Sequence, residues 1–259
     1  MRKPFVQFSL FVLGLVVLAC GHQQQPPKEP YSDAISLQKN EPGDSTLYGL
    51  ACDGCTDSIL VFLPFSGGDP DTFDIIVATQ EHRILGRPHI GDELAVILDP
   101  EDHAEAWKVI NLEELKGMWC YMVTPKLRAI ENMPKRMRRR MLEKMPDSLK
   151  QLLLTPREYC LRLKRDNTVQ TRGAGFRQTI TDDMSPVEFP PVKFYTEWRL
   201  YNGRLILKAD TIAGFKIEGA KPEIDTVDIA LMMHDSLVLQ FPDHTQSYYR
   251  KHEVEMSIK

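Results

Sequence analysis

Residues 198–207 read Trp-Arg-Leu-Tyr-Asn-Gly-Arg-Leu-Ile-Leu, and this stretch decides the fold. Asn202 and Gly203 both tolerate a positive φ, so the pair is the strongest short signal for a tight turn between two antiparallel strands. The flanking residues are of the apolar and aromatic types that strands favour. We therefore expect one strand over 192–201 and a second over 204–210.

The same pattern of short strands continues on both sides of this hairpin. Further strands are expected over 158–163, 168–171, 227–232, 236–240 and 247–251. Together with a strand around Trp119, they make roughly eight antiparallel strands joined by tight turns, which fits an up-and-down β-barrel with an interior cavity. We place this barrel domain at residues 113–259.

One segment, residues 127–154, breaks the strand pattern and lies between Pro125 and Pro156. We expect it to be helical. Pro134 can open its main helix, because proline is tolerated in a first turn. Pro146 must end or kink that helix, because proline donates no backbone hydrogen bond.

Methionine recurs every four residues on the expected helix, at Met133, Met137, Met141 and Met145. Such a stripe is typical of a helix face that fills apolar gaps, although thioethers can also bind Cu(I). The remaining positions are basic, and they indicate either a solvated face or a contact with lipid head groups or an anionic partner. These basic residues are Lys135, Arg136, Arg138, Arg139 and Arg140.

Ahead of the barrel, residues 44–112 carry a second group of short strands. Strands are expected over 47–51, 58–63, 74–78, 82–85 and 94–98, each bounded by Gly, Pro or Asp. This density of strands indicates a small OB-like or SH3-like barrel rather than a parallel sheet. The expected fold class is therefore mainly β, with a small barrel followed by a larger up-and-down barrel that carries a helical insertion.

Several segments of the larger unit resemble the lipocalin-like domain of bacterial lipoproteins. They are Leu115-Lys-Gly-Met-Trp119, the strands around Arg165-Asp-Asn, residues 198–207, and the stretch from Asp225 to Arg250. The resemblance covers about residues 115–252, with the helical segment as an insertion. It implies a barrel of the calycin type and no particular ligand.

The N-terminus has the layout of a secretory signal. Arg2 and Lys3 precede an apolar run over 5–18, and Ala19 is a small residue just before Cys20. This order resembles a bacterial lipobox, which implies that signal residues 1–19 are removed and that Cys20 is acylated. The polar, proline-rich residues 20–43 are expected to form a flexible tether.

These features predict a lipoprotein anchored to the outer membrane, and they leave open which face of that membrane it occupies. Removing residues 1–19 takes away two basic residues and no acidic one, so the mature chain has 30 basic and 36 acidic residues. This balance argues against nucleic acid as a partner.

Cys52 and Cys55 form the sharpest candidate site. Two thiols at this spacing can close a small disulfide, exchange it, or bind a soft metal. Gly54 permits the tight turn between them. A structural disulfide is the favoured interpretation, with redox exchange, metal binding and free thiols as alternatives. The surrounding residues 49–59 are similar to the Cys-x-x-Cys segment of the NlpE family of copper-homeostasis and envelope-stress lipoproteins.

Cys120 and Cys160 form a second candidate pair. We place them in the first two strands of the larger barrel, where adjacent strands could set them opposite each other. A disulfide and a pair of buried thiols are both compatible with this placement. His82, His89 and His103 lack the paired spacing of a zinc site.

The chain has none of the sequence motifs that mark common catalytic or cofactor sites. A nucleophile elbow, a phosphate loop, a dinucleotide fingerprint and a His-Glu-x-x-His motif are all missing. Asp99, Glu101, Asp102 and His103 form a local cluster that indicates a turn. We therefore expect a protein that is not an enzyme and needs no cofactor, and that binds a small apolar ligand or an envelope partner. The alternative is an envelope stress sensor, or a copper- or redox-handling lipoprotein, acting through Cys52 and Cys55.

Overall fold

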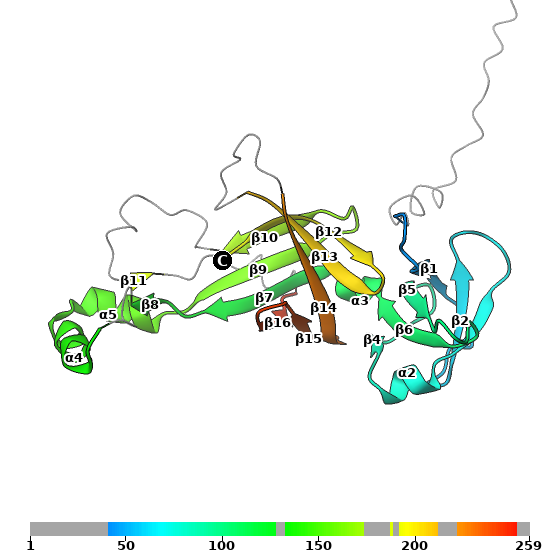
Figure 1. Cartoon of the computed structure of the whole chain (residues 1–259), viewed down its shortest axis with the longest axis horizontal. Coiled ribbons are helices and arrows are strands. Elements are labelled where there is room, and N and C mark those ends of the chain that lie inside the picture. The colour runs from blue at the N-terminus through cyan, green and yellow to red at the C-terminus, as the bar shows by residue number, and fades with distance from the viewer. Residues whose placement is uncertain (1–40, 128–132, 174–186, 189–191, 212–221, 253–259) are drawn as a thin grey trace, which may run out of the picture. The chain divides into compact units, whose positions relative to one another are not determined.

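A computed structural model describes residues 41–127, 133–173, 187–188, 192–211 and 222–252 (Figure 1). Within these ranges the chain is mainly β, as expected, and most of its strands belong to two sheets. The expected signal residues 1–19, Cys20 and nearly all of the expected tether lie outside the described residues.

The larger sheet has eight antiparallel strands in the order β10-β9-β7-β16-β15-β14-β13-β12. Consecutive barrel strands pair with each other, except β10 and β12, and the last strand returns to pair with the first, with Arg250 opposite Trp119. Between β10 and β12 there is one isolated bridge, from Thr168 to Glu197. The sheet is thus a nearly closed up-and-down barrel, as predicted. Its strands are β7 (Gly117–Val123), β9 (Arg157–Leu163), β10 (Val169–Gly173), β12 (Phe194–Tyr201), β13 (Arg204–Thr211), β14 (Glu223–Met233), β15 (Ser236–Gln240) and β16 (Thr245–Arg250).

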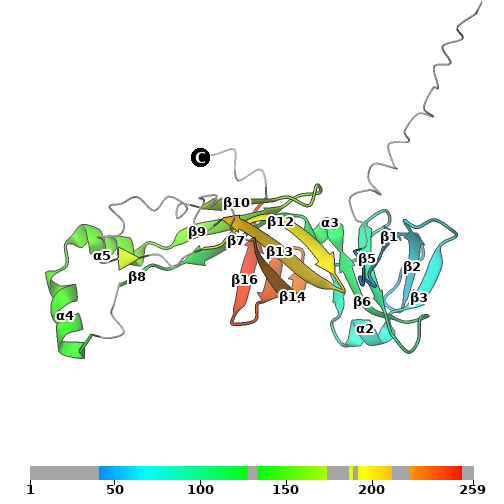
Figure 2. The same cartoon turned by 45° about the horizontal axis from the view of Figure 1, so that its top comes forward.

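The hairpin of β12 and β13 turns at Asn202 and Gly203, as predicted. Both residues have positive φ, 48° and 70°, which is the conformation of a two-residue type I′ turn. Trp198, Leu205 and Leu207 alternate with outward side chains and are almost fully buried in the barrel. Figure 2 shows this hairpin and β14 beside the long strands β7 and β9.

Large side chains fill the middle of the barrel. Trp119, Leu161, Leu237 and Tyr248 are among the residues around a residual space of about 10 Å³. This is little more than the room that one water molecule needs. The prediction of an interior cavity is therefore wrong for the middle of the barrel, because aromatic and leucine side chains from opposite walls meet there.

The smaller sheet has six strands in the order β3-β2-β1-β5-β6-β4, and only the β4–β6 pair is parallel. An isolated bridge from Asp74 to Glu105 sets the end of β3 beside the start of β6. The strands are β1 (Leu47–Ala51), β2 (Ile59–Pro64), β3 (Asp71–Asp74), β4 (Ile84–Leu85), β5 (Glu93–Leu98) and β6 (Ala106–Asn111).

One expected strand of this smaller unit is wrong. The segment 74–78 begins at the end of β3, and the chain then forms the short helix α2 (Ile76–Gln80). The Asp74 carboxylate accepts a hydrogen bond from the backbone N–H of Ile76 at 2.7 Å, which turns the chain at this point. Ala78 packs inward while Ile76 and Val77 are exposed.

One hydrophobic cluster spans both sheets, and the smaller sheet has a second cluster of its own. Tyr48, Ala95 and Ile110 of the smaller sheet belong to the same buried cluster as the interior of the barrel. Lys108 also reaches across and donates a hydrogen bond to the backbone oxygen of Gly203 at 3.0 Å. The expected boundary near residue 112 falls at the start of α3 (Leu112–Leu115), whose two leucines are fully buried in this cluster.

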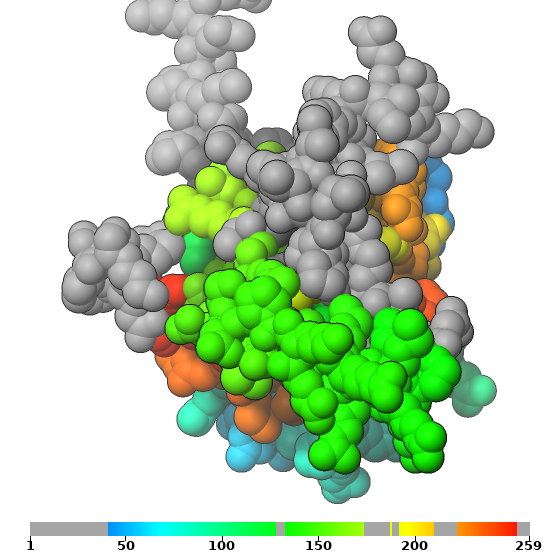
Figure 3. Space-filling model, turned by 90° about the vertical axis from the view of Figure 1, so that its left-hand side faces the viewer, coloured from blue at the N-terminus to red at the C-terminus, as the bar shows by residue number. Residues whose placement is uncertain are grey.

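The expected helical segment contains two helices, α4 (Lys135–Lys144) and α5 (Asp147–Leu154), with Pro134 and Pro146 directly before them. Both pack near a two-stranded sheet of β8 (Lys126–Leu127) and β11 (Val187–Glu188). Along the methionine stripe, Met145 is buried whereas Met137 is 60% exposed, so only part of the stripe packs inward. Figure 3 views the face that carries these helices, coloured green.

Candidate functional site

The eight-stranded barrel opens at one end into a cavity of about 370 Å³. This is the end at which β7 finishes and β12, β14 and β16 begin. The cavity lies above the filled interior, and Leu161 and Tyr248 line both spaces. We call this the open end of the barrel.

Aromatic rings form the floor of the open end. Tyr121 meets Tyr248 edge to face, with ring centres 5.1 Å apart, and Tyr195 and Phe241 complete the floor. Burial raises the pKa of Tyr121 to about 12 and also raises the pKa of Tyr195 and Tyr248. All three phenols are therefore neutral at physiological pH and present apolar faces with polar tips.

Charged and polar groups line the rim of the open end. The side chain of Asp225 is 14% exposed and accepts a hydrogen bond from the Tyr195 hydroxyl at 2.6 Å. It also forms an ion pair with Lys193 at 2.8 Å. His244 stacks on Phe241, with ring centres 4.7 Å apart, and contacts Asp243 at 2.7 Å. An apolar floor with a few polar groups at its edge is the usual composition of a small-molecule site.

The opposite end of the barrel is closed. The Arg250 guanidinium lies 4.3 Å from the centre of the Trp119 ring and donates hydrogen bonds to the backbone oxygens of Glu114 and Lys116. Trp119 in turn donates from its indole nitrogen to the backbone oxygen of Leu115, at 2.8 Å. We call this the closed end; it seats α3 and the smaller sheet.

Gly117, at the start of β7, makes room for this arrangement. It has a φ of +134°, and an added Cβ would lie 2.9 Å from Nη1 of Arg250. A side chain at this position would therefore displace the guanidinium from Trp119.

Cys52 and Cys55 follow β1 at one end of the smaller sheet. In the structure both residues are half-buried free thiols, whereas their spacing in the sequence favours a disulfide. The Cys55 sulfur lies 3.2 Å from the backbone oxygen of Cys52 and 3.4 Å from that of Val61, while the Cys52 sulfur lies 3.9 Å from the backbone oxygen of Leu50. Each sulfur thus has its own backbone partners. Gly54, with a φ of +96°, makes the turn between them.

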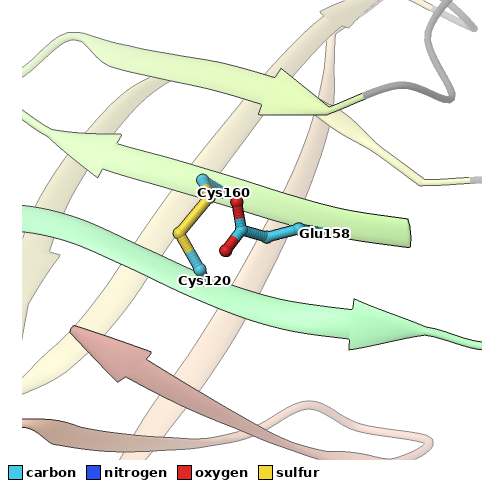
Figure 4. Close-up of side chains that lie close together, drawn as sticks. All are labelled: Cys120, Glu158 and Cys160. Carbon is cyan, nitrogen blue, oxygen red and sulfur yellow. A yellow bond between two sulfur atoms is a disulfide. The ribbon is translucent and has the colours of Figure 1, made fainter. Parts of the chain in front are cut away.

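Cys120 and Cys160 are joined by a disulfide between β7 and β9 (Figure 4). The two residues are directly opposite in the strand register and are buried on the outer side of the barrel wall. The Glu158 carboxylate lies beside the sulfurs and accepts hydrogen bonds from Tyr249 and Lys251, each at 2.6 Å. Because both sulfurs are in the disulfide, these side chains form a covalent cross-link and not a metal site.

The other groups that the sequence singled out are separate. Asp99 accepts hydrogen bonds from the backbone N–H groups of Glu101 and Asp102, which makes the turn between β5 and β6. His89 contacts Asp92 at 3.2 Å. Sequence reasoning missed the residues of the open end, because they come from strands that are distant in the chain.

Comparisons with protein-family models, with curated proteins and with solved structures gave no match. In the ranges that the structure describes, no helix has both the length and the apolar character needed to cross a membrane.

Proposed function

We propose that this chain is a membrane-anchored lipoprotein that binds a small, partly apolar molecule in the open end of its eight-stranded barrel and catalyses no reaction. The observation that carries the proposal is the contrast between the filled middle of the barrel and the cavity of about 370 Å³ above it. An aromatic floor would hold the apolar part of the molecule, and the rim would orient its polar part.

The lining also limits the chemistry of the molecule. The acidic groups Asp225 and Asp243 outnumber the single ammonium of Lys193, and that ammonium is already paired with Asp225 and Glu223. A neutral or cationic amphiphile is therefore favoured over an anionic one. With the middle of the barrel filled, the ligand would be held near the rim with part of its surface in solvent.

A fluorescent apolar amine, N-phenyl-1-naphthylamine, tests this site. We would use the mature chain, residues 20–259, with Cys20→Ser, so that no acyl chain, signal segment or detergent competes for the dye. We expect saturable binding of about one equivalent. Gln246→Trp, which fills the cavity from β16, should weaken binding at least about tenfold.

Ser247→Trp is the matched control, because the neighbouring residue in β16 is exposed and points to the other face of the sheet. It should leave dye binding unchanged. Equal binding by both tryptophan variants, or a signal that does not saturate, would refute the open end as the site.

The anchor is a separate part of the proposal and rests on residues 2–20 of the sequence. Mass spectrometry of the membrane-extracted protein should show an N-terminal, acylated Cys20. A soluble chain that begins at another residue would refute the anchor without affecting the binding site.

The free thiols of Cys52 and Cys55 support a second candidate function, metal or redox handling. Two half-buried thiols at this spacing are suited to bind a soft ion such as Cu(I). Copper titration of the chain beside a Cys52→Ser, Cys55→Ser variant tests it: binding that the variant loses supports this second function, and equal binding refutes it.

A further inference from the structure

Two histidines and one aspartate meet at the closed end of the barrel. His234 and Asp235 form the turn between β14 and β15, and His252 follows β16. The strand register brings them together: Ser236 pairs with Tyr249, and the backbone N–H of Arg250 donates to the backbone oxygen of Asp235 at 3.0 Å. Residues far apart in the chain are thus held side by side by main-chain contacts.

The three side chains have the spacing of metal ligands. The Asp235 carboxylate lies 3.2 Å from Nε2 of His252 and 3.8 Å from Nε2 of His234, and all three ligand atoms lie within 4.8 Å of one another. Ligands bound at about 2.0–2.2 Å to one ion lie roughly 3–3.5 Å apart. Small side-chain rotations would therefore suffice to bring all three atoms to one ion.

The chemistry of the set selects the kind of ion. Imidazole nitrogens together with a carboxylate suit Zn²⁺ and other divalent transition ions, whereas Ca²⁺ and Mg²⁺ prefer oxygen ligands throughout. All three side chains are more than half exposed, so an ion could enter without any opening of the fold.

We propose that His234, Asp235 and His252 form a binding site for a divalent transition-metal ion such as Zn²⁺, with water at its remaining coordination positions. The ion would tie the segment after β16 to the β14–β15 turn. It would therefore stabilise the folded chain by an amount that grows with the logarithm of the ion concentration above the dissociation constant. The site is distinct from the open end, which lies at the other end of the same strands, and from the thiols of the smaller sheet.

Calorimetric titration with Zn²⁺ tests the proposal. The protein is the mature chain, residues 20–259, with Cys20→Ser, Cys52→Ser and Cys55→Ser and without a histidine tag, so that no free thiol or tag competes for the ion. We expect one equivalent to bind at pH 7.5 and to be removed by a chelator. Co²⁺ in place of Zn²⁺ should give a visible absorption band from the bound ion.

His234→Ala and His252→Ala should each weaken Zn²⁺ binding at least about tenfold. His89→Ala is the matched control, because His89 also contacts an aspartate, Asp92, but belongs to no group of three possible metal ligands among the described residues. It should leave binding unchanged. Absence of binding, or an equal loss in the control variant, would overturn the proposal. Thermal melting without metal verifies that the variants are folded.

Discussion

The two ends of the eight-stranded barrel use their polar groups in different ways. At the closed end, Arg250 and Trp119 direct their donors to backbone oxygens of the chain and pack against the shared core. At the open end, Lys193 and Asp225 pair with each other on the rim of a cavity. One end uses its polar groups to hold elements of the fold together, and the other leaves them within reach of a ligand.

This difference predicts where substitutions will be costly. Groups that are buried and hydrogen-bonded to the backbone contribute to the free energy of unfolding, whereas ion pairs near solvent contribute little. Substitutions at the closed end should therefore reduce stability, and those at the open end should reduce binding.

The largest effect is expected for Trp119→Ala at the closed end. The side chain is 1% exposed, and its removal leaves a cavity in the barrel, which should cost about 3–5 kcal/mol of the free energy of unfolding. Urea denaturation followed by circular dichroism measures this loss. Trp119→Phe should recover part of it. A loss below about 1 kcal/mol would contradict the assignment of the closed end as the stable end.

Removal of the Cys120–Cys160 disulfide should have the next largest effect. The bond joins residues 40 positions apart, and the loop that it closes carries α4 and α5. Because the cross-link restricts the unfolded chain, Cys120→Ala with Cys160→Ala should lower the free energy of unfolding by about 2–4 kcal/mol. Denaturation of the wild-type chain with and without dithiothreitol should give a difference of the same size, and two identical curves would contradict it.

Arg250→Ala should cost about 1–3 kcal/mol, since it removes hydrogen bonds from a charged donor and a cation–π contact. Arg250→Lys keeps the charge but not the planar fork, so it should recover only a fraction of this loss. Denaturant midpoints of the three proteins measure the difference. If the lysine variant equals the wild type, the charge alone is what the closed end requires.

Alkaline pH should reduce stability through the buried tyrosines of both ends. Burial raises the pKa of Tyr121 to about 12 and also raises that of Tyr48, so the folded chain keeps protons that the unfolded chain loses near pH 10. The stabilisation is fully present below pH 10 and is lost as the pH rises toward 12, by at most about 1.4 kcal/mol per pH unit for each tyrosine. Denaturation at several pH values should show this slope, and Tyr121→Phe should make it shallower. A stability that is constant to pH 12 would contradict the burial of these phenols.

The smallest effect is expected for Cys52→Ala with Cys55→Ala, about 0.5 kcal/mol or less, because the thiols are half-buried at one end of the smaller sheet. In the native chain these thiols should react with iodoacetamide, unlike Cys120 and Cys160. If oxidation joins them in a disulfide, alkylation across a graded dithiol buffer gives its potential. A value below about −300 mV indicates a structural bond, and one near roughly −200 mV indicates redox exchange.

Much of the barrel could be predicted because strands such as β10 and β15 alternate inward and outward residues and because the β12–β13 hairpin turns at Asn202–Gly203. The strand β6 was missed because Lys108 interrupts its apolar pattern. In the structure that lysine is buried, and its ammonium group reaches Gly203. The sequence predicts a strand at α2 because its β-branched residues, Ile76 and Val77, favour strands. In the structure the Asp74 carboxylate accepts a hydrogen bond from the backbone N–H of Ile76, which overrides that preference.

The candidate sites were less predictable. The open end combines residues from β7, β12, β14 and β16, and the histidine–aspartate cluster joins a turn to the segment after the last strand. Neither set has a recognisable spacing in the sequence, because only the strand register brings its members together. The cysteine pairs show the same limit: spacing favoured the near pair, Cys52 and Cys55, whereas the structure joins the distant pair that faces across two strands.

The return of β16 to β7 has a consequence for the speed and order of folding. Within the barrel, each hairpin joins strands that are close in the chain, but Arg250 and Glu114, which meet at the closing seam, are 136 residues apart. Closing a longer loop costs more chain entropy, and such distant contacts slow folding. The seam should therefore form last, so that the half-folded chain has two separate sheets, one of β7, β9 and β10 and one of β12 to β16, with β7 and β16 as bare edges. Until these edges meet they can pair with other chains, which makes this step the moment at which the protein is most exposed to aggregation.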